Sequence, residues 1–195
     1  MDIIIRHKKN KDHLKVEEIT REAFYKDKQN NKKGYGCSEH FFVHLLREKD
    51  GIEDLNFVAT INDEIVGHII YSHSYIQTER KKIPVITFGP LTVKKSFQKQ
   101  GIGRALLNFS LDKAKSLGYG AVIIFGHPSY YPKFGFVPAR EYNLITKDNE
   151  TYDPFMALEL ISGYLSNIEG KFYESKIFDE EIYKEEIIKF DKSFR

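Results

Sequence analysis

One segment near the middle of the chain constrains the fold more than any other. A short run of strand-forming residues, Leu91 to Val93, leads into a basic loop, and two glycines, Gly101 and Gly103, then open an amphipathic helix that we expect over 103–117. The unbroken apolar run from Ala121 to Phe125 follows and predicts a strand covered on both faces. A strand, a helix and a strand in this order predict a mixed α/β domain.

Further elements are predicted on both sides of this segment. We expect strands over 3–6, 55–61, 65–76, 85–88 and 155–161, and helices after Asp12, after Ser38 and over 179–192. The sequence Asn62-Asp63-Glu64 between two β-rich runs predicts a hairpin turn. The pair Gly89-Pro90 interrupts a strand, because a proline has no N–H to continue the ladder of hydrogen bonds.

The composition limits the class of protein. Of the 195 residues, 41% are hydrophobic, so the chain is not a disordered one. Lys and Arg number 30 against 28 Asp and Glu, and a net charge of +2 gives no support to a nucleic-acid-binding protein. The single cysteine, Cys37, excludes an internal disulfide and a cysteine-cluster zinc site. Since no apolar run is long enough for a signal peptide or a membrane span, we expect a cytoplasmic protein without membrane, nucleic-acid or metal partners.

The glycine-containing loop indicates an anion site. Backbone N–H groups in the first turn of a helix have no partner within the helix, and glycines let a ligand approach them. Positive charge is expected around this turn, from Lys94, Lys95, Lys99 and Arg104. The loop lacks the Gly-Lys-Ser/Thr ending of a Walker loop, and Leu106 occupies the third-glycine position of a Rossmann fingerprint. An ordinary helix start with solvated lysines is the alternative interpretation.

Two linked motifs resemble those of a known family. The pattern Gln98-x-x-Gly101-x-Gly103 after a strand resembles the acetyl-CoA pyrophosphate loop of the GNAT N-acetyltransferase superfamily. The later segment 125–136 is similar to the superfamily's next element, a strand, a short helix bearing a tyrosine and a Gly-Phe pair. The resemblance is specific over 85–137. It implies a mixed, mostly antiparallel sheet with helices on both faces and a splayed parallel strand pair.

The resemblance also implies domain limits and site residues. It implies a GNAT domain over 1–165 and a C-terminal extension over 166–195, a strand and a helix packed on the same domain. Tyr131, four residues before Gly135, stands where the family has the general acid that protonates the departing thiolate; a packing aromatic is the alternative. Binding of the co-substrate acetyl-CoA is implied for Leu91, Thr92, Val93, Gln98, Lys99, Gln100, Gly101, Ile102, Gly103 and Arg104.

The general base and the acceptor are less constrained. Many relatives have a glutamate on the strand before the loop, but Val85 to Pro90 contains no acid, so His73, His127 and Glu39 stay open as alternatives. The resemblance implies an acceptor side formed by the loop 26–37 and the first two helices, with Tyr35, Glu39 and His40 as candidate lining residues.

These inferences predict an acetyl-CoA-dependent N-acetyltransferase. We expect a small-molecule or peptide amine as acceptor, direct transfer in a ternary complex, and a monomer or homodimer. The alternative, motivated by the missing glutamate, is a non-catalytic module with the GNAT fold that binds acyl-CoA or a protein partner. A nucleic-acid-binding function, suggested by the lysine-rich segment 26–33, ranks third.

Overall fold

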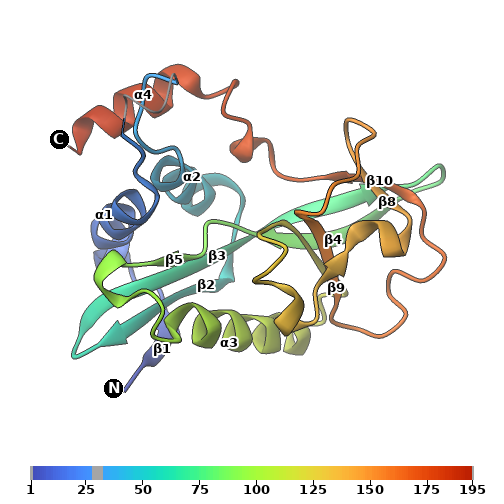
Figure 1. Cartoon of the computed structure of the whole chain (residues 1–195), viewed down its shortest axis with the longest axis horizontal. Coiled ribbons are helices and arrows are strands. Elements are labelled where there is room, and N and C mark those ends of the chain that lie inside the picture. Colours follow the sequence, from blue (N-terminus) through green and yellow to red (C-terminus); the bar gives the residue numbers. More distant parts are fainter. Residues whose placement is uncertain (1, 28–32, 195) are drawn as a thin grey trace. The chain divides into compact units, whose positions relative to one another are not determined.

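The structure, a computed structural model, describes residues 2–27 and 33–194, and it divides the chain into two compact units (Figure 1). The first unit comprises Met1–Tyr71, Gly89–Ser110 and Lys176–Arg195, and the second comprises Ser72–Phe88 and Leu111–Ser175. Strand β3 (Glu64–Gln77) and helix α3 (Ile102–Ser116) contribute residues to both units.

Among its described residues, the first unit contains a small antiparallel sheet and four α-helices, of which α3 is shared with the second unit. Its other elements are β1 (Ile4–His7), α1 (His13–Phe24), α2 (Glu39–Leu45), β2 (Gly51–Ile61), β5 (Thr92–Val93) and α4 (Lys184–Ser193). Strand β1 is antiparallel to β2, and β5 is antiparallel to β3. Asn62 and Asp63 join β2 to β3 with φ of 48° and 63°, the left-handed values that a tight hairpin turn requires. The predicted hairpin is therefore confirmed.

Helices cover both faces of this sheet, because side chains along a strand alternate between its faces. Val58 of β2 packs in one cluster with Val16 of α1 and Val43 of α2. Its neighbour Phe57 points the other way and meets Phe109 of α3 edge to face, with ring centroids 5.1 Å apart. Figure 1 shows α1 and α2 on one side of β2 and β3, and α3 on the other. The expectation of helices on both faces is confirmed.

A glycine brings helix α3 close to the sheet. A Cβ atom on Gly67 of β3 would lie 2.8 Å from Leu106 Cδ1, which is closer than real Cβ contacts. Ile102, the first residue of α3, is buried beside the same glycine. The small residue therefore fixes the depth at which the start of the helix, and with it the glycine-containing loop, sits on the first unit's sheet.

The second unit is built on a mixed sheet. Its remaining strands are β4 (Lys82–Phe88), β6 (Ala121–Phe125), β7 (Val137–Pro138), β8 (Leu144–Thr146), β9 (Phe155–Glu159) and β10 (Gly170–Tyr173). They are hydrogen-bonded in the order β3-β4-β6-β9-β7, with β10 pairing with β3 and β8. Strands β4 and β6 are parallel, with Ile86 opposite Val122, whereas β6 and β9 are antiparallel. This agrees with the predicted mixed, mostly antiparallel sheet containing a parallel pair.

The predicted C-terminal helix is too long at its start. We expected it over 179–192, but α4 begins at Lys184. The Glu180 carboxylate instead accepts a hydrogen bond from Ser38 Oγ at 2.6 Å and pairs with Lys33. These tertiary contacts outweigh the i,i+4 pairing that Glu180 could form with Lys184 if the helix began earlier.

The segment after residue 165 contributes β10 to the second unit and α4 to the first. The domain limit at that residue stays a prediction. Within the described ranges, no helix combines the length and the apolar character needed to cross a bilayer.

Candidate active site

The glycine-containing loop of the first unit has an unusual backbone. Lys99 has a φ of 61° and Gly101 a φ of 87°, both in the left-handed region. Gln98 Nε2 donates to the carbonyl of Val93 at 3.2 Å, and Gln100 Nε2 donates to the carbonyl of Ser96 at 3.1 Å. The two glutamine side chains therefore hold the shape of the loop, and binding of a ligand would fall to its main chain.

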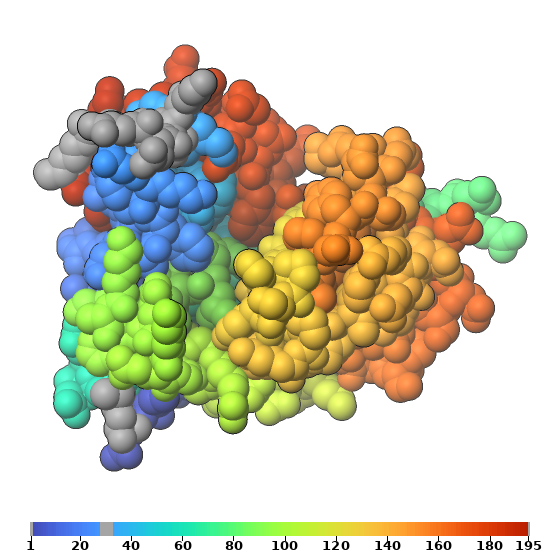
Figure 2. Space-filling model, in the orientation of Figure 1, coloured from blue at the N-terminus to red at the C-terminus, as the bar shows by residue number. Residues whose placement is uncertain are grey.

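The first turn of α3 forms the end of this loop. Helix α3 begins at Ile102, and Ala105 N donates to the carbonyl of Gly101 at 2.9 Å. A Cβ atom on Gly101 would meet no other atom within 4 Å, so the space beside this residue is open. Lys99 and Arg104 are exposed here, and this light-green segment reaches the surface in the space-filling view (Figure 2).

Two residues predicted in or around the acetyl-CoA site, Lys94 and Thr92, have side chains that already bind other residues of the chain. Lys94 forms an ion pair with Glu64, and this hydrogen bond raises the pKa of the lysine. The expected group of four cations around the helix start therefore has to be corrected, because Lys94 already has a carboxylate partner. The Thr92 hydroxyl is buried and lies 3.0 Å from the hydroxyl of Thr20 in α1. Any role of Thr92 in binding has to come from its main chain.

Tyr131 lies in the second unit, within an aromatic cluster. Its ring contacts Phe88 and Phe136, with centroid separations of 5.9 Å and 5.6 Å. It also covers Gly126, where a Cβ atom would overlap the tyrosine ring. Burial is the main cause that raises the pKa of Tyr131 to about 12, and the phenol is therefore protonated at neutral pH.

A short helix follows this tyrosine. Residues Pro132–Phe134 form a single 3₁₀ turn, and Gly135 ends it with a φ of 91° and a hydrogen bond from its N–H to the carbonyl of Pro132. The sequence predicted a short helix that contains the tyrosine, but Tyr131 directly precedes the helix as its N-cap residue. The reason is Pro132, whose fixed φ favours the first helical position.

Two of the three candidate bases, His127 and His73, lie in the second unit. His127 is exposed, and its Nδ1 lies 2.9 Å from Ser129 Oγ and 3.4 Å from Ser129 N. Since the backbone N–H can only donate, Nδ1 accepts, and the neutral ring carries its proton on Nε2. The carbonyl of His127 also accepts a hydrogen bond from Tyr131 N at 3.4 Å. His73 is exposed beside the ring of Tyr119 in the second unit.

The predicted acceptor-side residues are covered by helix α4. Tyr35 and His40 are both buried, so neither side chain lines an open pocket, contrary to our expectation. Residues 28–32 of the predicted loop lie outside the described residues. His40 instead lies between the rings of Phe190 and Phe194, each with a centroid separation of 5.0 Å. Burial lowers the pKa of His40 to about 4, so this imidazole is neutral at pH 7.

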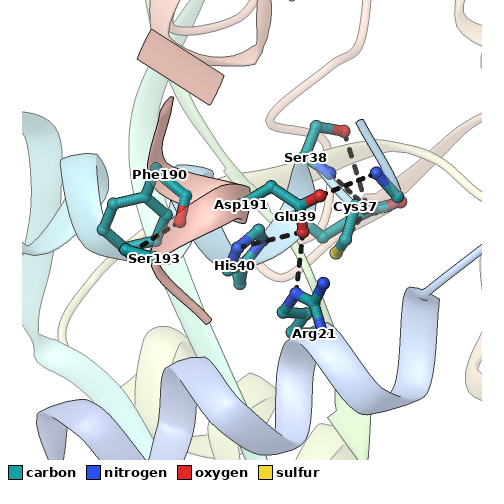
Figure 3. A network of polar contacts seen from close by, with 9 residues as sticks. Arg21, Cys37, Ser38, Glu39, His40, Phe190, Asp191 and Ser193 are labelled. Atoms are coloured by element: carbon teal, nitrogen blue, oxygen red, sulfur yellow. Dashed lines mark hydrogen bonds and ion pairs between the residues drawn. The ribbon is translucent and has the colours of Figure 1, made fainter. Parts of the chain in front are cut away.

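Asp191 of α4 is the centre of this buried region (Figure 3). Its side chain is 1% exposed. One carboxylate oxygen accepts a hydrogen bond from Arg21 Nε at 2.7 Å, and the other accepts one from Gly36 N at 2.9 Å. Asp191 therefore fastens the C-terminal helix to helix α1 and to the segment before α2. No local pattern in the sequence indicated this contact.

Cys37 and Glu39 lie at the start of α2. Cys37 Sγ donates to Glu39 Oε2 at 3.2 Å, and burial raises the pKa of the Cys37 thiol. A protonated, buried thiol is a poor nucleophile. Glu39 also accepts a hydrogen bond from Ser38 N at 3.1 Å.

Residues 2–27 and 33–194 contain no group of three or more His, Cys, Asp or Glu side chains that could hold a metal ion.

Comparison with known proteins identifies the family. Residues 53–138 match the family model described as an acetyltransferase (GNAT) domain. Over 134 residues the chain is 31% identical to the Escherichia coli K12 protein named uncharacterized N-acetyltransferase YhbS, covering 68% of this chain and 78% of that protein. The chain belongs to the GNAT N-acetyltransferase family. It is therefore an acetyltransferase, as the two linked motifs predicted.

Solved GNAT structures share the fold. The crystal structure of Escherichia coli YhbS in complex with CoA has a TM-score of 0.78 and 24% identity, over 91% of this chain and 92% of that one. A GNAT acetyltransferase of Brucella melitensis in complex with acetyl-CoA has a TM-score of 0.70 and 23% identity, over 91% of this chain and 99% of that one. These similarities confirm the predicted GNAT fold, whereas the roles of single residues stay predictions.

Proposed function

We propose that this GNAT chain transfers the acetyl group of acetyl-CoA directly to the amine nitrogen of a small-molecule or peptide acceptor. The observation that carries the proposal is the open left-handed loop at Gly101, directly before the first turn of α3. Further support comes from the two solved relatives, one in complex with CoA and the other with acetyl-CoA.

The loop fits a pyrophosphate on physical grounds. Anions bind well at helix N-termini, where unpartnered N–H groups and the helix dipole favour negative charge. In our proposal the main chain of 98–104 binds the pyrophosphate, and the exposed Lys99 and Arg104 add positive charge. The main chain of Leu91 to Val93 binds the pantetheine arm, since the Thr92 hydroxyl already has a partner.

Replacing Gly101 by alanine tests the loop. We expect Gly101→Ala to weaken CoA binding about tenfold, because the strained left-handed backbone must relax and turn an N–H away from a charged ligand. The affinity is measured by calorimetric titration with CoA. Gly118→Ala is the matched control, since Gly118 has a φ of 84° and open space at the other end of α3. Equal affinity losses in the two variants would contradict a specific role for Gly101.

The chemistry requires a proton acceptor for the amine and a proton donor for the thiolate. An alkylammonium with a pKa near 10.4 is a free amine in only about one molecule in 10³ at pH 7. After it loses a proton, its nitrogen forms a bond to the acetyl carbon, and the carbon–sulfur bond breaks. We assign Tyr131 as the donor to the departing sulfur, and its high pKa keeps this phenol protonated. The products are the acetylated amine, free CoA and one proton.

Direct transfer is favoured over a covalent acetyl-enzyme. The single cysteine is buried and protonated, so it does not provide the nucleophile that such an intermediate would need. For the base we favour His127, because it lies four residues before Tyr131 and is exposed. In the neutral ring the basic lone pair is on Nδ1, the atom beside Ser129, so Nδ1 would take the proton. His73 and Glu39 are the alternatives. A cytoplasmic location and a monomeric or dimeric state stay predictions.

A thiol-release assay tests this function. The protein is incubated with acetyl-CoA and a panel of amines while free thiol is monitored and acetylated amines are identified by mass spectrometry. We expect thiol release that depends on the amine. If no such thiol release is seen, a calorimetric titration with CoA separates two cases. CoA binding without turnover indicates the non-catalytic binding module. Absence of CoA binding excludes both the acetyltransferase and the binding module.

A further inference from the structure

Helix α4 is held on the first unit by one buried cluster of side chains (Figure 3). Both carboxylate oxygens of Asp191 are used, one by Arg21 of α1 and the other by Gly36 N. The ring of His40 in α2 is fully buried between two phenylalanine rings from the end of α4. The attachment of α4 therefore depends on polar groups that are shielded from water.

The imidazole of His40 makes no hydrogen bond in this cluster. Neither of its ring nitrogens has a hydrogen-bond partner among the residues that the structure describes. Nε2 lies 3.8 Å from an oxygen of Asp191, which is too long for a hydrogen bond, and that oxygen already accepts one from Arg21. A neutral ring in this position leaves one N–H donor unsatisfied, which is rare and costly in a folded protein. His40 is therefore a weak point in the attachment of α4.

The cluster has no acceptor for a second proton on this ring. An imidazolium has two N–H donors, and burial without acceptors opposes its charge. Among the charged and titratable groups around the ring, Asp191 of α4 favours protonation, whereas Arg21 of α1 and His44 of α2 oppose it. Arg21 offsets the attraction of Asp191, with which it pairs at 2.7 Å. Burial first, and then Arg21 and His44, lower the pKa of His40 to about 4.

The direction of the pH dependence follows from this lowered pKa. A histidine in water has a pKa of about 6.5, and His40 would return toward that value if α4 moved away. Because the attached state has the lower pKa, the neutral ring favours attachment above about pH 6.5, and this contribution is lost as the pH falls toward 4. Between pH 7 and pH 5 the population of the detached state should therefore rise about 20-fold.

We propose that helix α4 is a pH-sensitive cover of the first unit, and that protonation of His40 releases it from α1 and α2. The imidazolium becomes solvated as α4 leaves, and the hydrogen bonds that Arg21 and Gly36 N donate to Asp191 open with it. Release also uncovers Tyr35, which shares an apolar cluster with Ile187 of α4. The inference goes beyond acetyl transfer and does not depend on it.

The single cysteine is a natural probe of this release. Cys37, directly after Gly36, is buried. Its reaction with 2,2′-dithiodipyridine is followed at pH 7 and pH 5, and each rate is divided by the rate for the urea-unfolded chain at the same pH. We expect the normalised rate to rise about 20-fold at pH 5, in protein that circular dichroism shows to be folded. An unchanged rate, or loss of the whole fold at pH 5, would overturn the proposal.

Histidine variants assign the proton. His40→Leu, with His40→Gln as a second variant, removes the titrating ring and should leave less than about a twofold change in the normalised rate between the two pH values. His44→Leu is the matched control, because this histidine lies one turn further along α2 and its ring also contacts Phe190. It should keep the rise. A rise that persists without His40, or that disappears in His44→Leu, would overturn the assignment.

Amide hydrogen exchange of the wild-type chain gives a readout that needs no variant. The protection of Gly36 N–H, which donates to Asp191, should fall about 20-fold between pH 7 and pH 5 after correction for the intrinsic exchange rate. The amide of Val58, buried in β2 of the same unit, should keep its protection. Equal losses at the two amides would show that acid weakens the whole unit and would contradict a cover that opens by itself.

Discussion

Tyr131→Phe is expected to lower kcat by about 10²-fold or more, because a positioned proton donor contributes roughly 10²–10⁴-fold to a rate. The substitution removes only the hydroxyl, so the ring still packs against Gly126, Phe88 and Phe136. The affinity for CoA should therefore stay unchanged, and so should the free energy of unfolding to within about 1 kcal/mol. The measurement is steady-state acetylation of an amine, with calorimetric titration of CoA alongside.

The neighbouring tyrosine provides the control. Tyr130 packs edge to face against Tyr131, and burial raises its pKa too. Tyr130→Phe should leave kcat nearly unchanged. The pH dependence gives a second check: a phenol with a pKa of about 12 stays protonated, so its ionisation should not lower kcat as the pH rises from 8 to 10. A wild-type kcat in Tyr131→Phe would show that this tyrosine only packs.

Asp191→Ala is expected to lower the free energy of unfolding by about 3–5 kcal/mol, because it leaves a partly buried guanidinium without its partner. Arg21 would lose a 2.7 Å ion pair, and Gly36 N would lose its acceptor. The loss is measured by urea unfolding at pH 7. Since the first unit depends on this contact, we expect helix α4 to detach first and to expose the buried His40.

An exposed ion pair serves for comparison. Asp153 pairs with Arg140 at 2.9 Å, but its side chain is 71% exposed, and such pairs contribute about 0–1 kcal/mol. Asp153→Ala should therefore cost at most about 1 kcal/mol. If the two aspartate variants lost the same stability, Asp191 would not have the fastening role that its burial and its two partners indicate.

Local signals in the sequence predicted the central elements well. The turn at Asn62 and Asp63 needs two residues that tolerate a positive φ, and both are types that do. Helix α3 is amphipathic and is followed by Gly118 in the left-handed conformation. The sequence therefore predicted the last residue of the helix to within one position. The glycine-containing loop was found for the same reason, because its backbone demands particular residues at particular spacings.

The sequence could not predict contacts between distant segments. Asp191 and Arg21 are 170 positions apart, and nothing near either residue indicates the other. The same limit explains the wrong start of α4, where a contact with Ser38 overrides a favourable local pattern. It also explains Lys94, which seemed to belong to the anion site until its pairing with Glu64 across the β3–β5 pair was known.

The central claim, direct acetyl transfer to an amine, is tested most directly by initial rates over a matrix of acetyl-CoA and amine concentrations. Direct transfer requires both substrates to be bound together, so double-reciprocal plots should intersect. Parallel lines would indicate a covalent acetyl-enzyme and would contradict the account, since the only cysteine of the chain is buried and protonated. A rate that did not depend on the amine at all would contradict it more completely.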